Sequence, residues 1–591
     1  MRSSSIFALT GALALALAAA PAAAQFKTKY TTPQIKGLNG WQTSPVFTIG
    51  ETLPTKDPRF PKGYMPVGTL DGIGAMRLDH RTVRIFVNHE FSEAVGRSYK
   101  LKNGTELTGA RISCIDLDRS SREVRQAGLA YDTVYDRDFL VVTKPSQINE
   151  AGDPDDPRNL DPRSTAGFSR FCSSQLSTRG TFGLVDDVYF TGEETGDPGF
   201  HPNGGSLWAL DVAKGTLWAV PSAGRAAWEN TTVVNVGKGR VGLLIGDDNS
   251  PQDRNNPLSS AGTSTKPEDT IAAPLWLYVG RKNASKGEIA KALPSKVAPP
   301  KDSFLDRNGL LVGDLYYFVM EDPKVTDARQ FHGHGAWGFG HWKKIEILDE
   351  KMAGKPGYDA MGYKDSFTLR VEAKDGGAFQ FSRPEDVATM PWSNGRGAVL
   401  ASTGRGRVFG GADKWGVLYQ VYLHDNKRLD RKNSTVIRVA YDGNDKGNGD
   451  FGLRSPDNVA WADDHVIYAQ EDDAISSSDA FYEKGVFGET SKEEASIWAV
   501  HPTWGAALRI AQIDRSVVVP TGTTDAGIGD IGNWESSGVL DVSDLFQTRP
   551  WEKLMIATVQ AHGIRDGVIA TEGLGEGGQL FFLTHTWKWW R

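Results

Sequence analysis

Gly205-Ser-Leu-Trp-Ala-Leu-Asp211 has the length and composition of a β-strand, and its pattern recurs three more times along the chain. Each copy has a small residue, then an aliphatic residue, an aromatic residue and further apolar positions. The other copies are Ala273-Pro-Leu-Trp-Leu-Tyr-Val279, Gly416-Val-Leu-Tyr-Gln-Val-Tyr422 and Ala495-Ser-Ile-Trp-Ala-Val-His501. An aromatic residue that returns at one place in a strand suits sheets repeated around an axis, as in a β-propeller. Since aromatic residues favour strands in general, a set of unrelated edge strands is the alternative interpretation.

Short apolar segments separated by Gly, Asp, Asn and Pro continue along the chain from Gln25 onward. Examples are Thr82-Val-Arg-Ile-Phe-Val87, Asp187-Val-Tyr-Phe-Thr191 and Val241-Gly-Leu-Leu-Ile245. Such segments are typical of an all-β fold, and helical periodicity is scarce. We therefore predict an all-β fold, a single β-propeller domain over residues 25–591. Long inter-strand insertions are expected at the polar stretches 149–164, 249–269 and 442–450.

The N-terminal 24 residues have the pattern of a cleaved secretory signal. Arg2 precedes an apolar run over residues 6–20, and Ala22 and Ala24 supply a small-residue cleavage site. The alternative is a membrane anchor, but about 20 apolar residues are needed to span a bilayer and this run is shorter. Arg2 stands alone before Ser3, which favours the general secretory route over a twin-arginine route. We expect a periplasmic or secreted protein with no membrane span.

Composition excludes several classes of protein. The chain has 591 residues, a formal net charge of −7 and mixed charges throughout, which argues against a disordered chain and against nucleic-acid binding. Its two cysteines exclude a disulfide scaffold and a multi-cysteine zinc cluster. The phosphate-binding loop, the nucleophile elbow and the helical zinc-protease motif are all absent from the sequence.

Acidic and amide residues gather at the ends of the predicted strands. Each cluster alone has an ordinary explanation, because Asp and Asn initiate turns and acidic side chains are usually solvated. In a propeller, however, strand ends from several sheets converge on one axial face, where carboxylates would repel one another unless cations neutralised them. Calcium suits such oxygen ligands. The clusters are Asp71-Gly-Ile-Gly74, Asn88-His-Glu-Phe91, Glu193-Glu194, Asp247-Asp-Asn249, Pro456-Asp-Asn458, Gln470-Glu-Asp-Asp473 and Trp534-Glu-Ser-Ser537.

Two further segments add different chemistry to these clusters. Cys172 lies shortly before Glu193, and a thiolate beside carboxylates would favour iron over calcium. A buried core cysteine is the plainer interpretation, and a disulfide with Cys114 is a third one in an oxidising compartment. Arg383 and Glu385 point to the same side of an extended segment, so they can address one site or form a strand-end ion pair.

Taken in their order, these fragments resemble the PhoX-type alkaline phosphatases. The likeness extends from about residue 65 to residue 565, and no single fragment is specific on its own. The segments that carry it are Asp71-Gly-Ile-Gly74, Val87-Asn-His-Glu-Phe91, Cys172 with Glu193-Glu194, Gly224-Arg225 with Glu229-Asn230, Gly246-Asp-Asp248, Arg383-Pro-Glu385, Pro456-Asp-Asn458 and Glu535-Ser-Ser-Gly538. The stretch Phe171-Cys-Ser-Ser-Gln175 departs from the Gly/Pro-rich, Trp-containing segment of the best-known members.

The resemblance implies a six-bladed propeller whose axial site holds a cluster of Ca2+ and Fe3+ and hydrolyses phosphate monoesters. On that basis Cys172 would be the iron thiolate and Arg383 would bind the substrate phosphate. Glu385 would be both a metal ligand and a catalytic residue. The remaining ligand candidates are Glu90, Glu193, Glu194, Asp248, Asp457 and Asn458.

The function that follows is an exported alkaline phosphatase acting on small phosphate monoesters, expected to be a monomer. Two other functions suit the same oxygen-rich strand ends. One is a calcium-dependent lactonase or esterase, which would need neither Cys172 nor Arg383. The other is a non-catalytic exported propeller that binds calcium, because a propeller alone does not fix a function.

Overall fold

The computed structural model describes residues 25–149, 167–195, 204–249, 251–255, 268–405, 408–472 and 487–586. The predicted signal segment and most of the expected insertions at 149–164 and 249–269 lie outside these ranges. The third insertion, 442–450, is a turn-rich connection that leads into a short 3-10 helix at Gly449–Phe451. Within the described ranges, no helix is long and apolar enough to cross a membrane.

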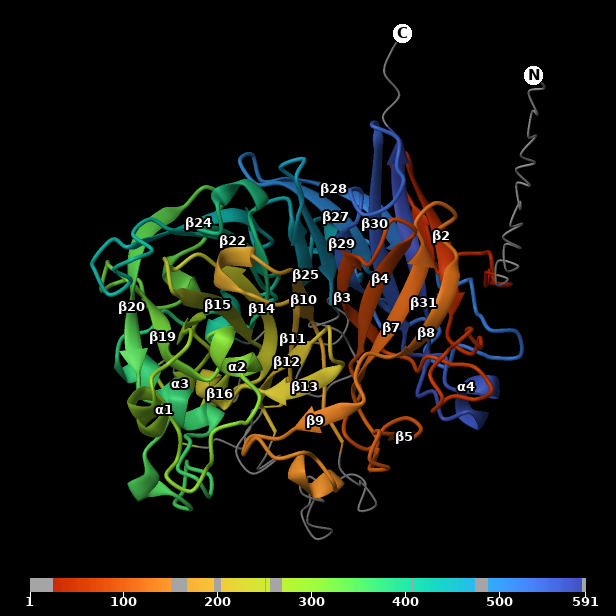
Figure 1. The fold of residues 1–591 in the computed structure, drawn as a ribbon. Helices are drawn as coiled ribbons and strands as arrows, with labels where there is room; N and C mark the ends of the chain where they lie inside the picture. The colour runs from red at the N-terminus through yellow and green to blue at the C-terminus, as the bar shows by residue number, and fades with distance from the viewer. Residues whose placement is uncertain are drawn as a thin grey trace, which may run out of the picture.

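Antiparallel strands that follow one another in sequence make up the sheets (Figure 1). One sheet contains β3 (Leu70–Arg77), β4 (Thr82–His89), β7 (Arg111–Asp118) and β8 (Val124–Leu129). The next contains β10 (Ser174–Ser177), β11 (Val188–Gly192), β12 (Leu207–Asp211) and β13 (Thr216–Ala219), with β9 (Thr133–Tyr135) at its edge.

The middle of the chain forms a larger sheet, in which two such units share an outer strand. The first unit contains β14 (Trp228–Val234), β15 (Arg240–Asp247), β18 (Trp276–Arg281) and β19 (Val312–Met320). The second contains β21 (Pro384–Thr389), β22 (Gly397–Ser402), β23 (Val417–Leu423) and β24 (Thr435–Asp442). The strand β20 (Trp337–Ile345) pairs with both β19 and β24 and joins the units.

Strands from both ends of the described chain complete the last two sheets. One contains β25 (Pro456–Trp461), β26 (Ile467–Glu471), β27 (Ser496–His501) and β28 (Ala506–Ile513), with β1 (Ile35–Gly37) at its edge. The other contains β29 (Glu535–Asp541), β30 (Glu552–Ala561), β31 (Gly577–Thr586) and β2 (Trp41–Thr48). Because β2 pairs with β31, strands near the two ends of the described part of the chain are joined in one sheet.

Short helices and two-stranded ribbons lie in the connections between these strands and form no layer of their own. The helices are α1 (Lys286–Ala292), α2 (Phe304–Arg307), α3 (Ser366–Asp375) and α4 (Gly567–Thr571), and two short ribbons pair β5 (Tyr99–Lys100) with β6 (Glu106–Leu107) and β16 (Gln252–Asp253) with β17 (Thr270–Ile271). The prediction of an all-β fold is therefore confirmed.

The first strands of the six units surround a common axis. In the described residues β3, β10, β14, β21, β25 and β29 each contact the next, and β29 contacts β3 again. In Figure 1 most of these strands lie near the middle of the molecule, while β20 and β8 lie toward its periphery. Sheets arranged radially around an axis form a β-propeller, and we call each unit a blade, named by its inner strand.

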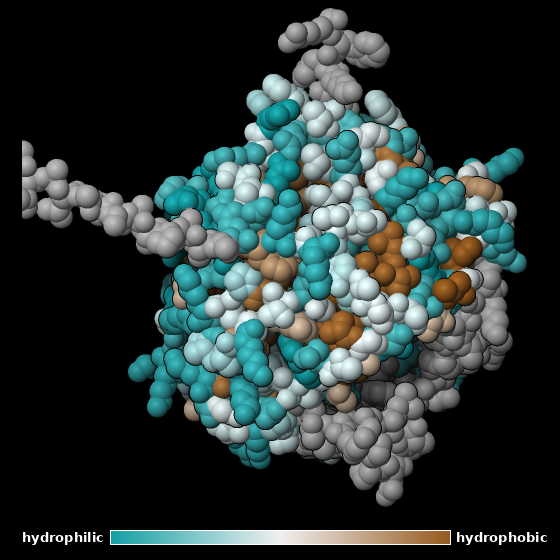
Figure 2. Space-filling view, turned by 90° about the vertical axis from the view of Figure 1, so that its right-hand side faces the viewer, coloured by the Kyte–Doolittle hydropathy of each residue, from teal (hydrophilic) through white to brown (hydrophobic). Residues whose placement is uncertain are grey.

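The recurring aromatic segments occupy equivalent places in four blades. They fall on β12, β18, β23 and β27, which are the third strands counted from the axis. Trp208 on β12 and Trp276 on β18 are essentially fully buried between blades. The repeat therefore reflects one packing position that is used again in successive sheets. On the face shown in Figure 2, by contrast, hydrophobic residues form small separate patches among hydrophilic ones.

Neighbouring blades approach backbone to backbone near the axis. A Cβ atom added at Gly246 on β15 would lie 1.7 Å from the carbonyl oxygen of Glu385 on β21. At Gly72 on β3, an added Cβ would lie 2.4 Å from the backbone nitrogen of Ser174 on β10. Neither contact can relax by rotating a side chain, so only glycine fits at these positions.

We expect Gly246→Ala to lower the melting temperature of the protein and to displace Glu385. Overpacking of this kind costs about 1–3 kcal/mol or more, because backbone atoms must move. Gly287 in α1 is the matched control, since an added Cβ there meets nothing within 4 Å. Gly287→Ala should be neutral or stabilising by up to about 1 kcal/mol. Thermal unfolding followed by circular dichroism tests both, and equal melting temperatures for the two variants would contradict the packing argument.

Candidate metal centre

A cavity of about 480 Å³ lies at the end of the axial channel where the inner strands begin. Residues at the start of several inner strands line it, whereas residues farther along the same strands line a second cavity. We call the first the acidic cavity. Its charged and titratable lining consists of nine carboxylates, three arginines, one cysteine and one histidine: Glu90, Glu194, Glu229, Asp248, Glu385, Asp457, Asp472, Glu535, Glu576, Arg170, Arg383, Arg565, Cys172 and His562.

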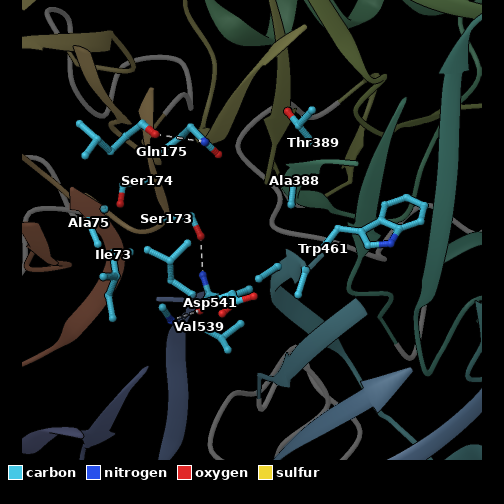
Figure 3. Close-up of a pocket in the computed structure, with 18 of the residues that line it drawn as sticks. Ile73, Ala75, Ser173, Ser174, Gln175, Ala388, Thr389, Trp461, Val539 and Asp541 are labelled. Carbon is cyan, nitrogen blue, oxygen red and sulfur yellow. Dashed lines mark hydrogen bonds between the residues drawn. The ribbon is translucent and has the colours of Figure 1, made fainter. Parts of the chain in front are cut away.

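The second cavity has a different character (Figure 3). Its lining is largely apolar or uncharged and includes Ile73, Ala388 and Val539. Asn458 belongs to this side. Its amide nitrogen donates to Ser173 and Asp71, and its amide oxygen accepts a bond of 3.0 Å from the backbone nitrogen of Gly538. Asn458, which the sequence suggested as a metal ligand, thus ties inner strands together and does not line the acidic cavity.

A β-bulge near the start of the inner strand aims carboxylates at the axis. Register shifts occur at Leu70/Ile73, Trp228/Thr231, Pro384/Val387 and Pro456/Val459 in four of the blades. A bulge bends the strand and redirects a side chain, which is why bulges are common beside active sites. The carboxylates carried by these bulges are Asp71, Glu229, Glu385, Asp386 and Asp457, all buried, and of these Glu229, Glu385 and Asp457 line the acidic cavity.

Left-handed backbone precedes three of these bulged strands. Thr69, Arg383 and Ser455 have φ angles of 47°, 64° and 41°. This conformation is uncommon for residues other than glycine, and most uncommon for a β-branched residue such as threonine. Strain of this kind persists only where the surroundings enforce it, and it clusters at functional sites.

The second strand of a blade ends beside the start of the inner strand and adds another acidic residue. Glu193-Glu194 and Asp247-Asp248 are equivalent pairs. In each, the first carboxylate accepts a hydrogen bond from the indole of a third-strand tryptophan, over 3.2 Å from Trp208 to Glu193 and 2.9 Å from Trp276 to Asp247. The second carboxylate of each pair lines the acidic cavity.

This alternation separates the two glutamates that the sequence could not tell apart. Glu194 lines the cavity, whereas the Glu193 carboxylate is fully buried and also accepts a bond of 3.1 Å from the backbone nitrogen of Ser169. Glu193 therefore belongs to the support of the blade and not to the cavity lining. Successive residues of an extended chain point to opposite sides, so only one of the two can face the axis.

Cys172 stands between two sets of oxygen atoms. Its sulfur forms one close group with Asp71 and Glu90 and another with Glu194 and Glu229, and in each the potential ligand atoms lie within 4.8 Å of one another. The thiol also lies 3.3 Å from Asp71 Oδ2. Cys172 and Cys114 are both free, so the alternative of a disulfide between them is wrong for this structure.

Arginine side chains neutralise part of the negative charge of the cavity carboxylates. Arg383 binds Asp248 through two hydrogen bonds of 2.8 and 2.7 Å and lies 2.7 Å from Glu385 Oε1. Arg170 bridges Glu90 and Glu194 at 2.7 and 2.5 Å. The predicted proximity of Arg383 and Glu385 is therefore present, as an ion pair within the cavity. With nine carboxylates against three arginines, negative charge remains in large excess.

Burial and mutual repulsion change the titration of these groups. Burial and neighbouring carboxylates raise the pKa of Glu385 well above its usual range, although the charge of Arg383 acts to lower it. Burial and nearby acidic groups raise the pKa values of Glu229 and Cys172 in the same way. For Asp248 burial acts in the same direction, but the Arg383 charge outweighs it and the pKa falls below its ordinary value.

The donor set fits bound cations. Asp457 Oδ1 is buried and has no hydrogen-bond partner among the described residues, which is costly for a carboxylate oxygen unless a cation meets it. Carboxylate oxygens are the ligands that calcium prefers, and a thiolate among them favours a transition metal. Protonation is the other way to neutralise these groups, and it competes with metal binding.

Comparison with known proteins supports the fold. No family model matches the chain, and no curated protein matches its sequence. Among solved structures, Pseudomonas fluorescens PhoX in complex with vanadate, a transition state analogue, matches with a TM-score of 0.54 at 15% identity, over 94% of this chain and 96% of that one. A periplasmic gluconolactonase of Pseudomonas aeruginosa matches at 12% identity over 90% and 88% of the chains, with a TM-score of only 0.29. The first match establishes a PhoX-like propeller fold and, at this identity, nothing finer.

Several cavity residues were missed by the sequence analysis as site candidates. Asp472 and His562 each directly follow a strand, as did several of the residues that were chosen, whereas Arg170 lies in the loop before β10. For Asp472 the signal was available, because Glu471-Asp472 repeats the acidic pair of two other blades. Arg170 and His562 carried no such signal, since an isolated Arg or His near a strand end is common on any protein surface.

We expect Glu229→Gln to stabilise the metal-free protein and to weaken its stabilisation by added Ca2+. The substitution removes one buried negative charge and keeps an oxygen that can accept the 3.1 Å bond from Ser173. Melting temperatures with EDTA and with CaCl2 test this. Glu193→Gln is the control, because Glu193 lies outside the cavity and its loss should leave the Ca2+-induced shift unchanged. A full Ca2+-induced shift in Glu229→Gln would contradict the assignment.

The buried Glu193 carboxyl should make stability depend on pH. Burial raises its pKa to about 7 from an ordinary value of 4.5, so the folded protein holds a proton that the unfolded chain has lost. Stability from this group is therefore complete below pH 4.5 and falls as the pH rises to about 7. Between pH 5 and pH 8, the melting temperature of the metal-free Glu193→Gln variant should change less with pH than that of the parent protein. An unchanged slope would show that Glu193 is ionised throughout.

Proposed function

We propose that this protein is an exported, metal-dependent phosphomonoesterase built on a single six-bladed propeller domain. Its substrates would be small phosphate monoesters, and the protein would act as a monomer in the periplasm or outside the cell. The observation that carries the proposal is the meeting of Cys172, the bulge carboxylates and Arg383 in one axial cavity. The PhoX-like fold supports it, since that neighbour was solved with a transition state analogue bound.

The proposed metals are Ca2+ and Fe3+. Cys172 would be a ligand of iron, because a thiolate is a soft donor, and its position between two oxygen groups suits two neighbouring cations. The proposed carboxylate ligands are Glu90, Glu194, Glu229, Glu385, Asp248 and Asp457, with Asp71 beside them. When bound, the cations would offset this charge, attract the phosphoryl oxygens and make a water molecule more acidic.

Arg383 would position the phosphate. Hydrolysis of a phosphate monoester spreads negative charge over the phosphoryl oxygens, which a fixed guanidinium stabilises. The two bonds to Asp248 hold the plane of Arg383 in place. Its third nitrogen lies 3.4 Å from Asp472 Oδ2. Without such arginines and cations, the cavity carboxylates would repel a phosphate dianion.

The test is metal analysis combined with turnover of p-nitrophenyl phosphate before and after chelation. We expect both iron and calcium in the purified protein, and turnover that is lost with chelator. Cys172→Ser should lower turnover by about 100-fold or more and reduce the iron content, because it removes a proposed ligand. Cys114→Ser on β7 is the matched control, since Cys114 does not line the cavity, and it should retain both turnover and metal.

Other outcomes identify the competing functions. Calcium without iron, together with hydrolysis of lactones or carboxyl esters, would indicate a calcium-dependent lactonase or esterase. Calcium with no turnover of any ester would indicate a binding module. Full phosphatase turnover in a well-folded Cys172→Ser variant would refute the proposed site.

A further inference from the structure

The wall of the acidic cavity beyond the carboxylates contains one imidazole. His562 follows the end of β30, two residues after Gln560, and both side chains line the cavity. The amide of Gln560 donates to Asp71 Oδ2 over 2.8 Å and approaches Glu90 Oε2 at 3.4 Å. His562 is therefore on the wall next to one of the two groups that share the Cys172 sulfur.

Two carboxylates from neighbouring segments of the same blade hold the imidazole ring of His562 in place. His562 Nδ1 lies 2.8 Å from Glu576 Oε1, while Nε2 lies 3.5 Å from Glu535 Oε1. Glu576 is itself held, because it accepts a hydrogen bond of 3.0 Å from Thr69 and lies 3.6 Å from Arg565. This arrangement anchors Nδ1 and leaves Nε2 as the more weakly held nitrogen. A carboxylate partner on one ring nitrogen orients the other toward its task.

The same surroundings keep the imidazole charged. Burial acts to lower the pKa of His562, but Glu576 and Glu535 outweigh it and raise the pKa well above its ordinary value. Burial would raise the pKa of Glu576, but the charge of His562 keeps it low. The groups that face His562 are Glu535 from β29, Glu576 before β31, and Arg565 from its own loop. The ring therefore holds its proton to a higher pH than an ordinary imidazole does.

No other group in the described cavity lining can easily take this role. Lysine and tyrosine are missing from the lining residues that the structure describes, and an arginine does not release its proton. The proposed metal ligands are Glu90, Glu194, Glu229, Asp248, Glu385 and Asp457, whereas Glu535 and Glu576 hold the His562 ring. A substrate whose leaving group is an alkoxide needs a proton as the ester bond breaks, because an alkoxide is a strong base.

We infer that His562 is the proton donor to the leaving oxygen, a catalytic residue of the phosphomonoesterase reaction proposed above, on which this inference rests. The oxygen of water forms a new bond to phosphorus as the ester P–O bond breaks. The electron pair of that bond remains on the leaving oxygen, which takes the proton from His562 Nε2. The attacking water releases one proton to solvent and the neutral imidazole regains one from solvent, so the products are an alcohol and inorganic phosphate.

The experiment compares two leaving groups in one variant. With ethyl phosphate, which releases a basic alkoxide, His562→Asn should lower kcat/KM by about 10²- to 10⁴-fold, the usual contribution of a general acid. With p-nitrophenyl phosphate, whose leaving group is stable as an anion, the loss should be less than about 10-fold. The exposed His80→Asn serves as control and should change neither rate. Metal content and melting temperature are measured on each variant.

A second variant tests the role if His562→Asn folds poorly. Glu576→Gln removes the charge that raises the pKa of His562, so the alkaline fall in ethyl phosphate turnover should move to lower pH. Equal losses on both substrates, or an unmoved pH profile in Glu576→Gln, would overturn the inference and leave the phosphatase function standing. A parent protein that hydrolyses neither substrate would instead overturn the proposed function itself.

Discussion

Repulsion among buried carboxylates at one end of the propeller axis is the constraint on which the site depends. Bulged inner strands bring Glu229, Glu385 and Asp457 toward one another, and Asp248 joins them from a neighbouring strand end. Such charges are tolerated only when they are protonated or neutralised by a cation. Arg383 and Arg170 supply part of that compensation, and the rest of it favours metal ions.

The blade repeat explains how the fold supplies so many acidic groups without losing its core. Third-strand tryptophans hold one carboxylate in two of the acidic pairs: Trp208 holds Glu193 and Trp276 holds Asp247. The next residue is then free to face the axis. Structural and functional acids therefore sit side by side in the sequence, and their separation is a consequence of strand alternation.

Much of the fold was predictable from the sequence, because its signals are local. The aromatic repeat was correctly interpreted as a radial one, since the same packing position recurs on β12, β18, β23 and β27. Most of the proposed cavity residues were found because they follow or begin strands. Glu193 and Asn458 lie outside the lining of the acidic cavity because the bulges and the direction of each side chain depend on pairing with a neighbouring strand, which local composition does not encode.

The sequence alone determined three features, since each follows from residue type and period: the strand-length apolar segments, the acidic strand ends and the repeated aromatic position. Only the tertiary structure decided which acids meet. Ring closure through β2 and β31 brings residues hundreds of positions apart into one cavity, and the bulges choose the side chains that enter it. The environment of His562 likewise exists only after folding, because Glu535 at the start of β29 and Glu576 just before β31 meet it when β29, β30 and β31 pair in one sheet.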